Sequence, residues 1–542
     1  MKFEWNRFEM AILKNINLQE LSLANVVEMQ AKQSPSLPVL RFVYVGDDGE
    51  LKTDMRNYEE LWKNASALAS TIIEKQKGVE GNIALMMNNH PEFVETMLAT
   101  SILGLPFVPI DPRARGLKLA YMLSHTDCSG LVCAEYCLAQ VLEILADVPN
   151  LQWILCVSDS EIKQEIISDQ GDLVGCYQQA LMNKSDAALP SKVSPESPMF
   201  MMFTSGTTGN PKAVVYSHRR YMALADSMAK MGVDEGDVLY TGLSLTHINA
   251  QNFLRNSLAL GVPLVISRKF TKSRLWDICR EYGCTLFSLL GGMIPEIYAV
   301  PEKPGDADNP VRLIISSGMP PSIWKDFERR FGVQLLEVYG ATEGGGLSNP
   351  PGLGPVGSVG KPSHEWEAEI LDSRGQPCDV GVEGEICFRR KDGQAMVVQY
   401  YKNTEASADK VKDGWLHMGD LGHKDENGWF YFHHRVGGGV RRNGDFVNTA
   451  LVEATLLKSS WLQDVFVYGV ARPENIAGEK TLVAAVVPSV KQEFSEALLR
   501  KFCKLNLEKN DIPEIFQVLD AIPKTVSEKP IEKECVALLG LT

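Results

Sequence analysis

The stretch TSGTTGNPK, from Thr204 to Lys212, combines residue types that can hold a phosphate group. Its glycines let the backbone turn close to a ligand, and successive backbone N–H groups in such a turn form a concave cradle for an anion. The Thr and Ser hydroxyls add hydrogen-bond donors, and Lys212 adds a positive charge. The spacing differs from the P-loop pattern GxxxxGK(S/T), and an ordinary polar loop of this composition is the alternative interpretation.

A second polar stretch, ATEGGG, follows the apolar run LLEVYG and carries one carboxylate, Glu343. Mg²⁺ prefers hard oxygen ligands and is usually held by one or two carboxylates together with substrate phosphates. Glu343 is therefore a candidate metal ligand, and an exposed loop acid is the alternative. A third polar stretch, SGMPP, follows the apolar run RLIISS.

Strands that alternate with helices are expected to position these stretches. Short apolar runs bounded by turn residues predict buried strands at 82–87, 153–157, 199–203, 263–267, 285–290, 312–317 and 335–340. Helical patterns lie between most of them, such as the apolar stripe that starts at Pro91 and stops at Gly104. This alternation predicts an α/β fold with a mostly parallel sheet. Ligands collect beyond the carboxyl ends of such strands, so the three polar stretches are expected to build one site.

The chain changes character after Gly346. A stretch rich in Gly and Pro is followed by EAEILD, GEICFRR and MVVQYY, which predict a small antiparallel sheet or β-barrel. Gly437 to Gly439 form a flexible boundary, so we expect a large N-terminal domain of layered α/β subdomains at 1–434 and a small, mobile α/β C-terminal domain at 435–542. In the latter, VFVYGVA and TLVAAVVP predict strands, and one helix is predicted to be apolar at Phe494, Leu498, Phe502 and Leu505.

Length and composition limit the class of protein. A chain of 542 residues is too long for one core, and 45% hydrophobic with 23% charged residues is usual for a globular protein. The net charge of −14 argues against nucleic acid or an anionic membrane surface as the main partner. The 11 cysteines form no CxxC pair, so reduced thiols and a cytoplasmic location are expected. No signal peptide or membrane span is expected, because even the most apolar stretch contains Glu95 and two prolines.

The ordered motifs TSGTTGNPKA, YGATEGG, GWLHMGDLG and PKTVSEKP resemble those of the adenylate-forming superfamily, over nearly the whole chain. That superfamily includes acyl- and aryl-CoA synthetases, nonribosomal peptide adenylation domains and firefly luciferases. FERRFGVQLLEVYG and EGEICFRR look most like the carnitine/crotonobetaine-type CoA ligases. The resemblance implies that a small carboxylic acid reacts with ATP and Mg²⁺ to give an acyl-adenylate and pyrophosphate, after which coenzyme A displaces AMP. Because carboxylate and α-phosphate repel each other, the protein must neutralise and position them.

The resemblance also implies roles for individual residues of the N-terminal domain. The β- and γ-phosphates of ATP would be held by Thr204, Ser205, Gly206, Thr207, Thr208, Gly209 and Lys212. Thr342 would hold the α-phosphate, Glu343 would bind Mg²⁺, and Tyr339 would stack on adenine. Asp420 would accept hydrogen bonds from both ribose hydroxyls, and His247 would border the acyl pocket, where a structural histidine is the alternative. Further nucleotide-binding positions implied by the resemblance are Gly318, Met319, Glu337, Gly340 and Arg435.

The C-terminal part departs from the family pattern at two places. Lys529 matches the lysine that reaches the acyl carboxylate and the α-phosphate, where a positive charge is worth ~3–4 kcal/mol in the transition state. Glu528 and Glu532 stand where the family usually has Gly and Arg, which would weaken the positive potential around Lys529. At the expected hinge, Gly437 replaces the usual charged residue, so rotation of the small domain would be sterically easy.

Coenzyme A would be bound after that rotation by a segment that contains Arg442 and Gly444. Two other readings of the sequence stay open: transfer of the acyl group to a carrier-protein thiol, and a degenerate member that binds nucleotide without turnover. A homodimer is a further expectation. The glycines of SLLGGM would permit a bulky acyl group, but they do not identify the carboxylate.

Overall fold

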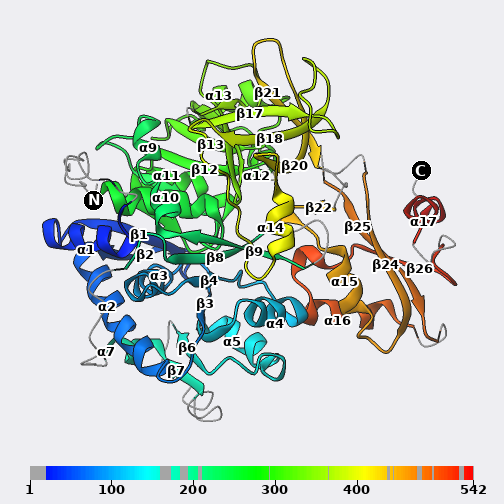
Figure 1. The fold of residues 1–542 in the computed structure, drawn as a ribbon, viewed down its shortest axis with the longest axis horizontal. Coiled ribbons are helices and arrows are strands. Elements are labelled where there is room, and N and C mark those ends of the chain that lie inside the picture. The colour runs from blue at the N-terminus through cyan, green and yellow to red at the C-terminus, as the bar shows by residue number, and fades with distance from the viewer. Residues whose placement is uncertain are drawn as a thin grey trace.

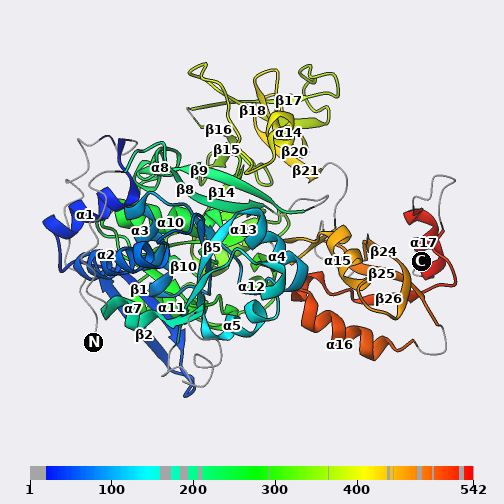
Figure 2. The ribbon, with the colours of Figure 1, turned by 60° about the horizontal axis from the view of Figure 1, so that its bottom comes forward.

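The computed structural model describes residues 17, 20–158, 173–182, 193–204, 210–291, 293–363, 365–435, 440–443, 445–472, 479–490, 494–523 and 530–540. Ser205 to Gly209, Gly437, Gly444 and Lys529 lie outside the described residues, as does the side chain of Arg435. The chain forms a large N-terminal α/β domain and a small C-terminal α/β domain, which lie side by side in Figures 1 and 2. None of the described helices is both long and apolar enough to cross a membrane.

The first sheet of the large domain has seven strands in the order β7-β6-β5-β3-β4-β8-β9. All neighbouring strands are parallel except β8 and β9, which pair antiparallel. Its strands are β3 (Asn82–Met86), β4 (Phe107–Pro109), β5 (Cys128–Ala134), β6 (Trp153–Val157), β7 (Val174–Cys176), β8 (Pro198–Thr204) and β9 (Lys212–Ser217).

The second sheet has nine strands in the order β16-β15-β14-β13-β12-β10-β11-β1-β2. They are β1 (Pro38–Val45), β2 (Leu51–Asn57), β10 (Leu239–Thr241), β11 (Leu264–Ser267), β12 (Leu286–Leu290), β13 (Leu313–Ser317), β14 (Gln334–Ala341), β15 (Gly344–Asn349) and β16 (Lys361–Pro362). The predicted strands therefore form, but in two sheets rather than one. The first polar stretch follows a strand of the seven-stranded sheet, whereas the other two follow strands of the nine-stranded sheet.

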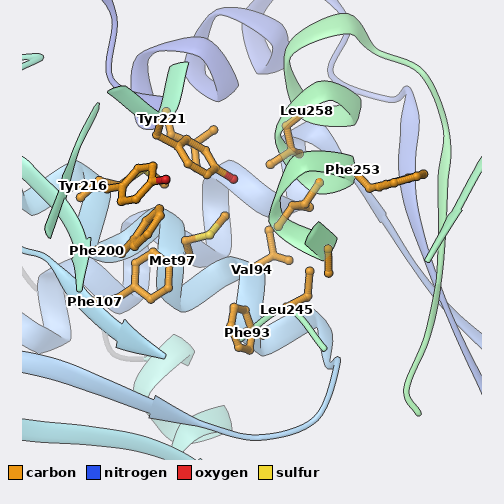
Figure 3. Close-up of a cluster of buried hydrophobic side chains, with 14 of the residues drawn as sticks. Phe93, Val94, Met97, Phe107, Phe200, Tyr216, Tyr221, Leu245, Phe253 and Leu258 are labelled. Atoms are coloured by element: carbon orange, nitrogen blue, oxygen red, sulfur yellow. The ribbon is translucent and has the colours of Figure 1, made fainter. Parts of the chain in front are cut away.

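Helices between the two sheets join them into one core. They are α1 (Leu23–Gln33), α2 (Tyr58–Lys75), α3 (Pro91–Leu103) and α10 (Ile248–Leu260), of which α1 contacts the other three. Figure 3 shows the apolar side chains that connect α3 and α10 to the seven-stranded sheet. Helix α3 begins at Pro91 and ends at Gly104 in the left-handed conformation, φ 68°, as predicted. The predicted apolar stripe is buried, and so are the other residues from Phe93 to Ile102, because the surrounding elements enclose the helix.

Further helices of the large domain cover the outer faces of the sheets, whereas α7, α8 and α9 pack into the same core as α1, α2, α3 and α10. Helices α4 and α5 pack on the seven-stranded sheet, and α11, α12 and α13 pack on the nine-stranded sheet. The bounds are α4 (Gly116–His125), α5 (Glu135–Leu142), α7 (Tyr177–Met182), α8 (His218–Met222), α9 (Ser227–Lys230), α11 (Leu275–Tyr282), α12 (Met293–Tyr298) and α13 (Trp324–Phe331).

The expected small antiparallel sheet forms from β17 (Trp366–Leu371), β18 (Gly384–Arg390), β19 (Val411–Lys412), β20 (Trp415–Lys424) and β21 (Phe430–Arg435), with α14 (Thr404–Lys410) beside it. The prediction of a strand at MVVQYY is wrong. This segment runs along the edge strand β9 instead, where the Val215 N–H donates to the Gln399 carbonyl at 2.8 Å and the Tyr401 N–H donates to the Ala213 carbonyl at 2.8 Å. These two bonds and one isolated bridge are too few to make a ladder.

The small domain contains the sheet β24-β25-β26 and the short hairpin β22–β23. Helix α16 buries Leu499 and Cys503, whereas Leu498 is 50% and Leu505 is 57% exposed, so the predicted face is wrong. The reason is that α16 carries apolar residues on both sides. The bounds are β22 (Arg441–Arg442), β23 (Asp445–Phe446), α15 (Thr449–Leu456), β24 (Leu462–Val470), β25 (Thr481–Pro488), α16 (Glu496–Asn506), η6 (Lys509–Asp511), β26 (Ile515–Val518) and α17 (Glu532–Leu539).

Candidate active site

A cleft of about 720 Å³ lies where the two large sheets, the small antiparallel sheet and the C-terminal domain meet. The first sheet contributes the ends of β4 and β8 and the start of β9, and the second contributes the β14–β15 turn. The residues before α10, parts of α4, α14, β18 and β20, and η6 also line it. Of the predicted site residues, the cleft is lined by Thr204, Lys212, His247, Gly340, Thr342 and Glu343.

Thr204 and Lys212 bring both ends of the predicted phosphate loop to the cleft. They face each other across the antiparallel β8–β9 pair, and the Thr204 hydroxyl donates to the Lys212 carbonyl at 3.4 Å. The Lys212 ammonium lies 5.3 Å from the centre of the Tyr400 ring, within the range of a cation–π contact. The strand pair therefore fixes the ends of the loop and places a positive charge at the cleft wall.

Thr342 and Glu343 form the two-residue turn between β14 and β15, so the stretch ATEGGG is a hairpin rather than an irregular loop. The Glu343 side chain is largely buried, and the Tyr400 hydroxyl donates to its Oε1 at 2.7 Å. Among the described residues, no hydrogen-bond donor reaches its other oxygen, Oε2. A buried carboxylate with one oxygen held and the other open to the cleft is a donor set that fits Mg²⁺.

The core of the seven-stranded sheet fixes the backbone of this turn. The Arg220 guanidinium donates to the Thr342 and Glu343 carbonyls at 2.9 and 2.6 Å, and the Tyr216 hydroxyl donates to the Thr342 carbonyl. Tyr216 in turn stacks on Phe200, with ring centres 4.6 Å apart, in the cluster of Figure 3. These hydrogen bonds therefore connect the two sheets at the place where their predicted functional motifs meet.

Asp420 and Tyr339 contact each other beside the cleft. The Tyr339 hydroxyl donates to Asp420 Oδ2 at 2.6 Å, and Asp420 lies opposite Arg435 on the neighbouring strand. The Tyr339 ring lies nearly parallel to the Phe388 ring, with centres 6.3 Å apart. Asp420 and Tyr339, which are predicted to bind the ribose and the adenine, are therefore adjacent. The residues that line the cleft at this place are their chain neighbours Gly419 and Gly340.

Glu385 and His417 support this part of the site, and the sequence analysis missed both. Glu385 Oε2 lies 2.7 Å from His417 Nδ1, and its Oε1 accepts a hydrogen bond from the Gly419 N–H at 2.7 Å. The Cys387 sulfur lies 3.5 Å from the same imidazole nitrogen. Because Gly419 directly precedes Asp420, this pair fixes the backbone that carries the aspartate. No signal in the sequence connects them, since Glu385 lies on an expected strand and His417 lies in the separate motif GWLHMGDLG.

His247, immediately before α10, faces Asp111, which the sequence analysis also missed. His247 Nε2 lies 3.8 Å from Asp111 Oδ2, and the Arg113 guanidinium donates to the same carboxylate at 2.8 Å. Burial alone would raise the pKa of Asp111, but the neighbouring His247 imidazole and the hydrogen-bonded Arg113 guanidinium hold it well below its usual range. His247 therefore has a permanent anionic partner at the cleft wall.

Gly318, Met319 and Glu337 lie together behind the cleft rather than along its described wall. The Glu337 carboxylate accepts hydrogen bonds from the Ser316 hydroxyl and from the N–H groups of Gly318 and Met319. Burial raises the pKa of Glu337, and these hydrogen bonds oppose part of that increase. Glu337 thus shapes the third polar stretch, and nucleotide contacts by these three residues stay a prediction.

Arg442 is engaged within the small domain. Its guanidinium donates to the carbonyls of Asn510 and Ile512 at 3.0 and 2.6 Å and lies 2.9 Å from the Glu514 carboxylate. These partners fix the segment after the glycine boundary. A contact between Arg442 and coenzyme A stays a prediction, as do the roles of Lys529, Gly444 and Ser205 to Gly209, which lie outside the described residues.

The position of Tyr400 leads to the first testable prediction. Tyr400→Phe removes the donor to Glu343 Oε1 and keeps the ring beside Lys212. Loss of a hydrogen bond to a charged group costs about 1.5–3 kcal/mol, so the Mg²⁺ concentration needed for half-maximal activity should rise by about tenfold or more. A Mg²⁺ titration of ATP-dependent activity measures this. Tyr401→Phe, which removes a hydroxyl from the neighbouring residue bonded to Asp127, is the matched control and should leave the Mg²⁺ requirement unchanged.

Two family models match consecutive parts of the chain. Residues 27–401 match the family model AMP-binding enzyme, and residues 451–529 match the AMP-binding enzyme C-terminal domain. The crotonobetaine/carnitine–CoA ligase of Salmonella heidelberg is 29% identical over 483 residues, which cover 88% of this chain and 91% of that relative.

The solved structures of the o-succinylbenzoate CoA synthetase of Bacillus subtilis are similar at 22% identity and cover 95% of this chain and 98% of theirs. The TM-score is 0.75 for a double mutant bound to the product analogue OSB-NCoA and 0.62 for the complex with AMP. Since the first family model alone covers most of the chain, the chain belongs to the AMP-binding enzyme family.

Proposed function

We propose that this AMP-binding enzyme is a carboxylate–CoA ligase that uses ATP to form an acyl-adenylate and then transfers the acyl group to coenzyme A. The observation that carries the proposal is the meeting of Lys212 and Glu343 in one cleft, although they belong to different sheets. A positive charge for phosphates and an open carboxylate for a divalent ion are what Mg-ATP requires. The CoA ligase relatives support coenzyme A as the acceptor of the acyl group.

In the first step, the residues of the cleft bind and orient two anionic substrates. We assign the triphosphate to Lys212 and to the loop between Thr204 and Lys212. The hydroxyl of Thr342, on the turn between β14 and β15, is assigned to the α-phosphate, and Asp420 is assigned to the ribose. Glu343 would hold Mg²⁺, which when bound supplies positive charge to the phosphate oxygens. Lys529 is assigned to the acyl carboxylate from its motif.

The acyl group is assigned to the side of the cleft near His247. Asp111, which Arg113 holds in place, lies 3.8 Å from the His247 ring, and α10 begins directly after His247. The relatives support a small carboxylate such as crotonobetaine or carnitine as the first substrate to test. The eleven free cysteines support a cytoplasmic location.

For the second step, we propose that the small domain, residues 435–542, rotates about the hinge that the sequence assigns to Gly437, which lies outside the described residues. The higher TM-score with the OSB-NCoA-bound enzyme than with the AMP-bound form supports assigning the described arrangement to the thioester-forming state. A homodimer is proposed as the oligomeric state, and size-exclusion chromatography with light scattering tests it.

Product analysis tests the reaction. With ATP, Mg²⁺, coenzyme A and a panel of carboxylic acids, at least one acid should give AMP, pyrophosphate and acyl-CoA in equal amounts, measured by mass spectrometry and pyrophosphate release. If a phosphopantetheinylated carrier protein is acylated and coenzyme A is not, the acceptor is a carrier protein and the proposed ligase is wrong.

A further inference from the structure

We propose that Lys118 is a positioning residue for the thioester-forming step, because it fastens the C-terminal domain to α4 in the arrangement described above. This inference rests on the proposed function, since it concerns which of the two half-reactions the arrangement serves. Lys118 lies in the first turn of α4 and belongs to the large domain, whereas its two partners, Glu508 and Asp511, belong to the small domain.

The ion pairs of Lys118 join the domains directly. Its ammonium lies 3.0 Å from Glu508 Oε1 and 3.9 Å from Asp511 Oδ2. The side chains are 25%, 9% and 9% exposed, respectively, so solvent screens the three charges only weakly. Burial would lower the pKa of Lys118, but the two carboxylates raise it above its usual value, so the ammonium stays charged.

The partners of Lys118 are fixed to the segment that follows the glycine boundary. Glu508 precedes η6, and Asp511 ends it. Arg442 donates to the Asn510 and Ile512 carbonyls, and the Asn443 amide donates to the Asn510 side chain at 2.9 Å. The segment around η6 therefore makes two connections: it anchors the small domain to α4 of the large domain, and it holds β22, the first strand after the glycine boundary.

Close packing surrounds this ion-pair cluster. Helix α15 contacts α4, and an added Cβ at Gly116 would lie 3.1 Å from the Asn506 carbonyl. Gly116 also has a φ of +50°, so glycine permits both the local backbone and the approach of α16. Rotation of the small domain must separate this contact and leave buried charges without partners, which is unfavourable. The Lys118 cluster therefore shifts the equilibrium between the two orientations of the small domain toward the described one.

Lys118 also lines the cleft, so direct binding of a substrate phosphate is the competing explanation. Two carboxylates already neutralise its ammonium. Direct binding would appear as a raised KM for coenzyme A or ATP, whereas positioning of the domain would appear in kcat for thioester formation with KM unchanged.

The test measures the two half-reactions separately in wild type, Lys118→Met and Lys118→Arg. Adenylate formation is followed by ATP–pyrophosphate exchange, and thioester formation is followed from preformed acyl-adenylate and coenzyme A. Lys118→Met should slow thioester formation by about tenfold and leave exchange within about twofold, and Lys118→Arg should restore most of the loss. Lys52→Met, which breaks an exposed ion pair with Asp48 inside the large domain, is the matched control and should change neither rate.

A charge exchange and a structural readout complete the test. Lys118→Glu should be at least as slow as Lys118→Met, and adding Glu508→Lys and Asp511→Lys should recover thioester formation. Hydrogen exchange should increase together at α4 and η6 in Lys118→Met and at neither in Lys52→Met. Equal loss of both half-reactions, a raised KM without a change in kcat, or no recovery in the charge exchange would overturn the proposal. Absence of exchange in the wild type with every acid would instead refute the ligase function on which it rests.

Discussion

Glu343→Gln should lower the rate of adenylate formation by about 10²–10³-fold, the range observed when one preorganised electrostatic group is removed from an active site. The amide keeps the size of the side chain and can still accept the hydrogen bond from Tyr400, so the turn between β14 and β15 should be preserved. It loses the negative charge that Mg²⁺ requires.

The measurement is acid-dependent ATP–pyrophosphate exchange at saturating ATP, together with a Mg²⁺ titration. The Mg²⁺ requirement should rise, and thermal unfolding should change little. Glu367→Gln, which weakens an exposed ion pair with Arg389 on the small antiparallel sheet, is the control and should keep full exchange. Full exchange in Glu343→Gln at the wild-type Mg²⁺ requirement would remove Glu343 from the proposed metal site.

Asp420→Asn should raise the KM for ATP by about 10–10²-fold, because a hydrogen bond to a charged group is worth about 1.5–3 kcal/mol and the amide cannot accept from both ribose hydroxyls as well as from Tyr339. The Tyr339 hydroxyl, 2.6 Å from Asp420 Oδ2, would also lose its charged acceptor. Asp47→Asn, at an exposed position of the β1–β2 turn, is the control.

A comparison of ATP with 2′-deoxy-ATP makes the test specific for the ribose. The wild type should discriminate against 2′-deoxy-ATP, and the discrimination should nearly disappear in Asp420→Asn, since the missing hydroxyl then loses no partner. Equal discrimination by both proteins would show that Asp420 does not contact the 2′-hydroxyl, whatever its effect on KM.

Much of the fold could be predicted from local sequence signals. Apolar runs between turn residues became strands because a parallel strand is buried on both faces. Proline and glycine set the ends of α3 because each acts within one turn of the helix. The number of sheets could not be predicted in this way. A buried strand has the same pattern in either sheet, and long-range packing decides which sheet it joins.

The candidate site was predictable where its residues lie within one motif. Thr342 and Glu343 directly follow β14, and Lys212 begins β9 at the end of the loop after β8, so their positions followed from the strands. Tyr400 was missed because it is 57 residues from Glu343 in the chain, and no periodic pattern connects the two. Asp111 was missed for a similar reason, since only the meeting of two elements places it beside His247.

The face of α16 shows a different limit. Leu498 and Leu499 are adjacent, so they lie on different sides of the helix, and hydrophobicity alone does not say which side meets the core. The larger apolar residues suggested the wrong side, whereas the small Cys503 lies on the buried one. The contacts of Lys118 with Glu508 and Asp511 could not be predicted either, because they depend on the placement of one domain against the other.

The most direct test of the central claim is ATP–pyrophosphate exchange without coenzyme A, measured with and without each acid of the panel and with and without Mg²⁺. An enzyme that forms an acyl-adenylate in this cleft should catalyse exchange only when ATP, Mg²⁺ and its own acid are all present. Exchange that needs coenzyme A would contradict an adenylate formed before the thiol reacts. ATP binding without exchange for any acid at high protein concentration would identify a nucleotide-binding protein without turnover.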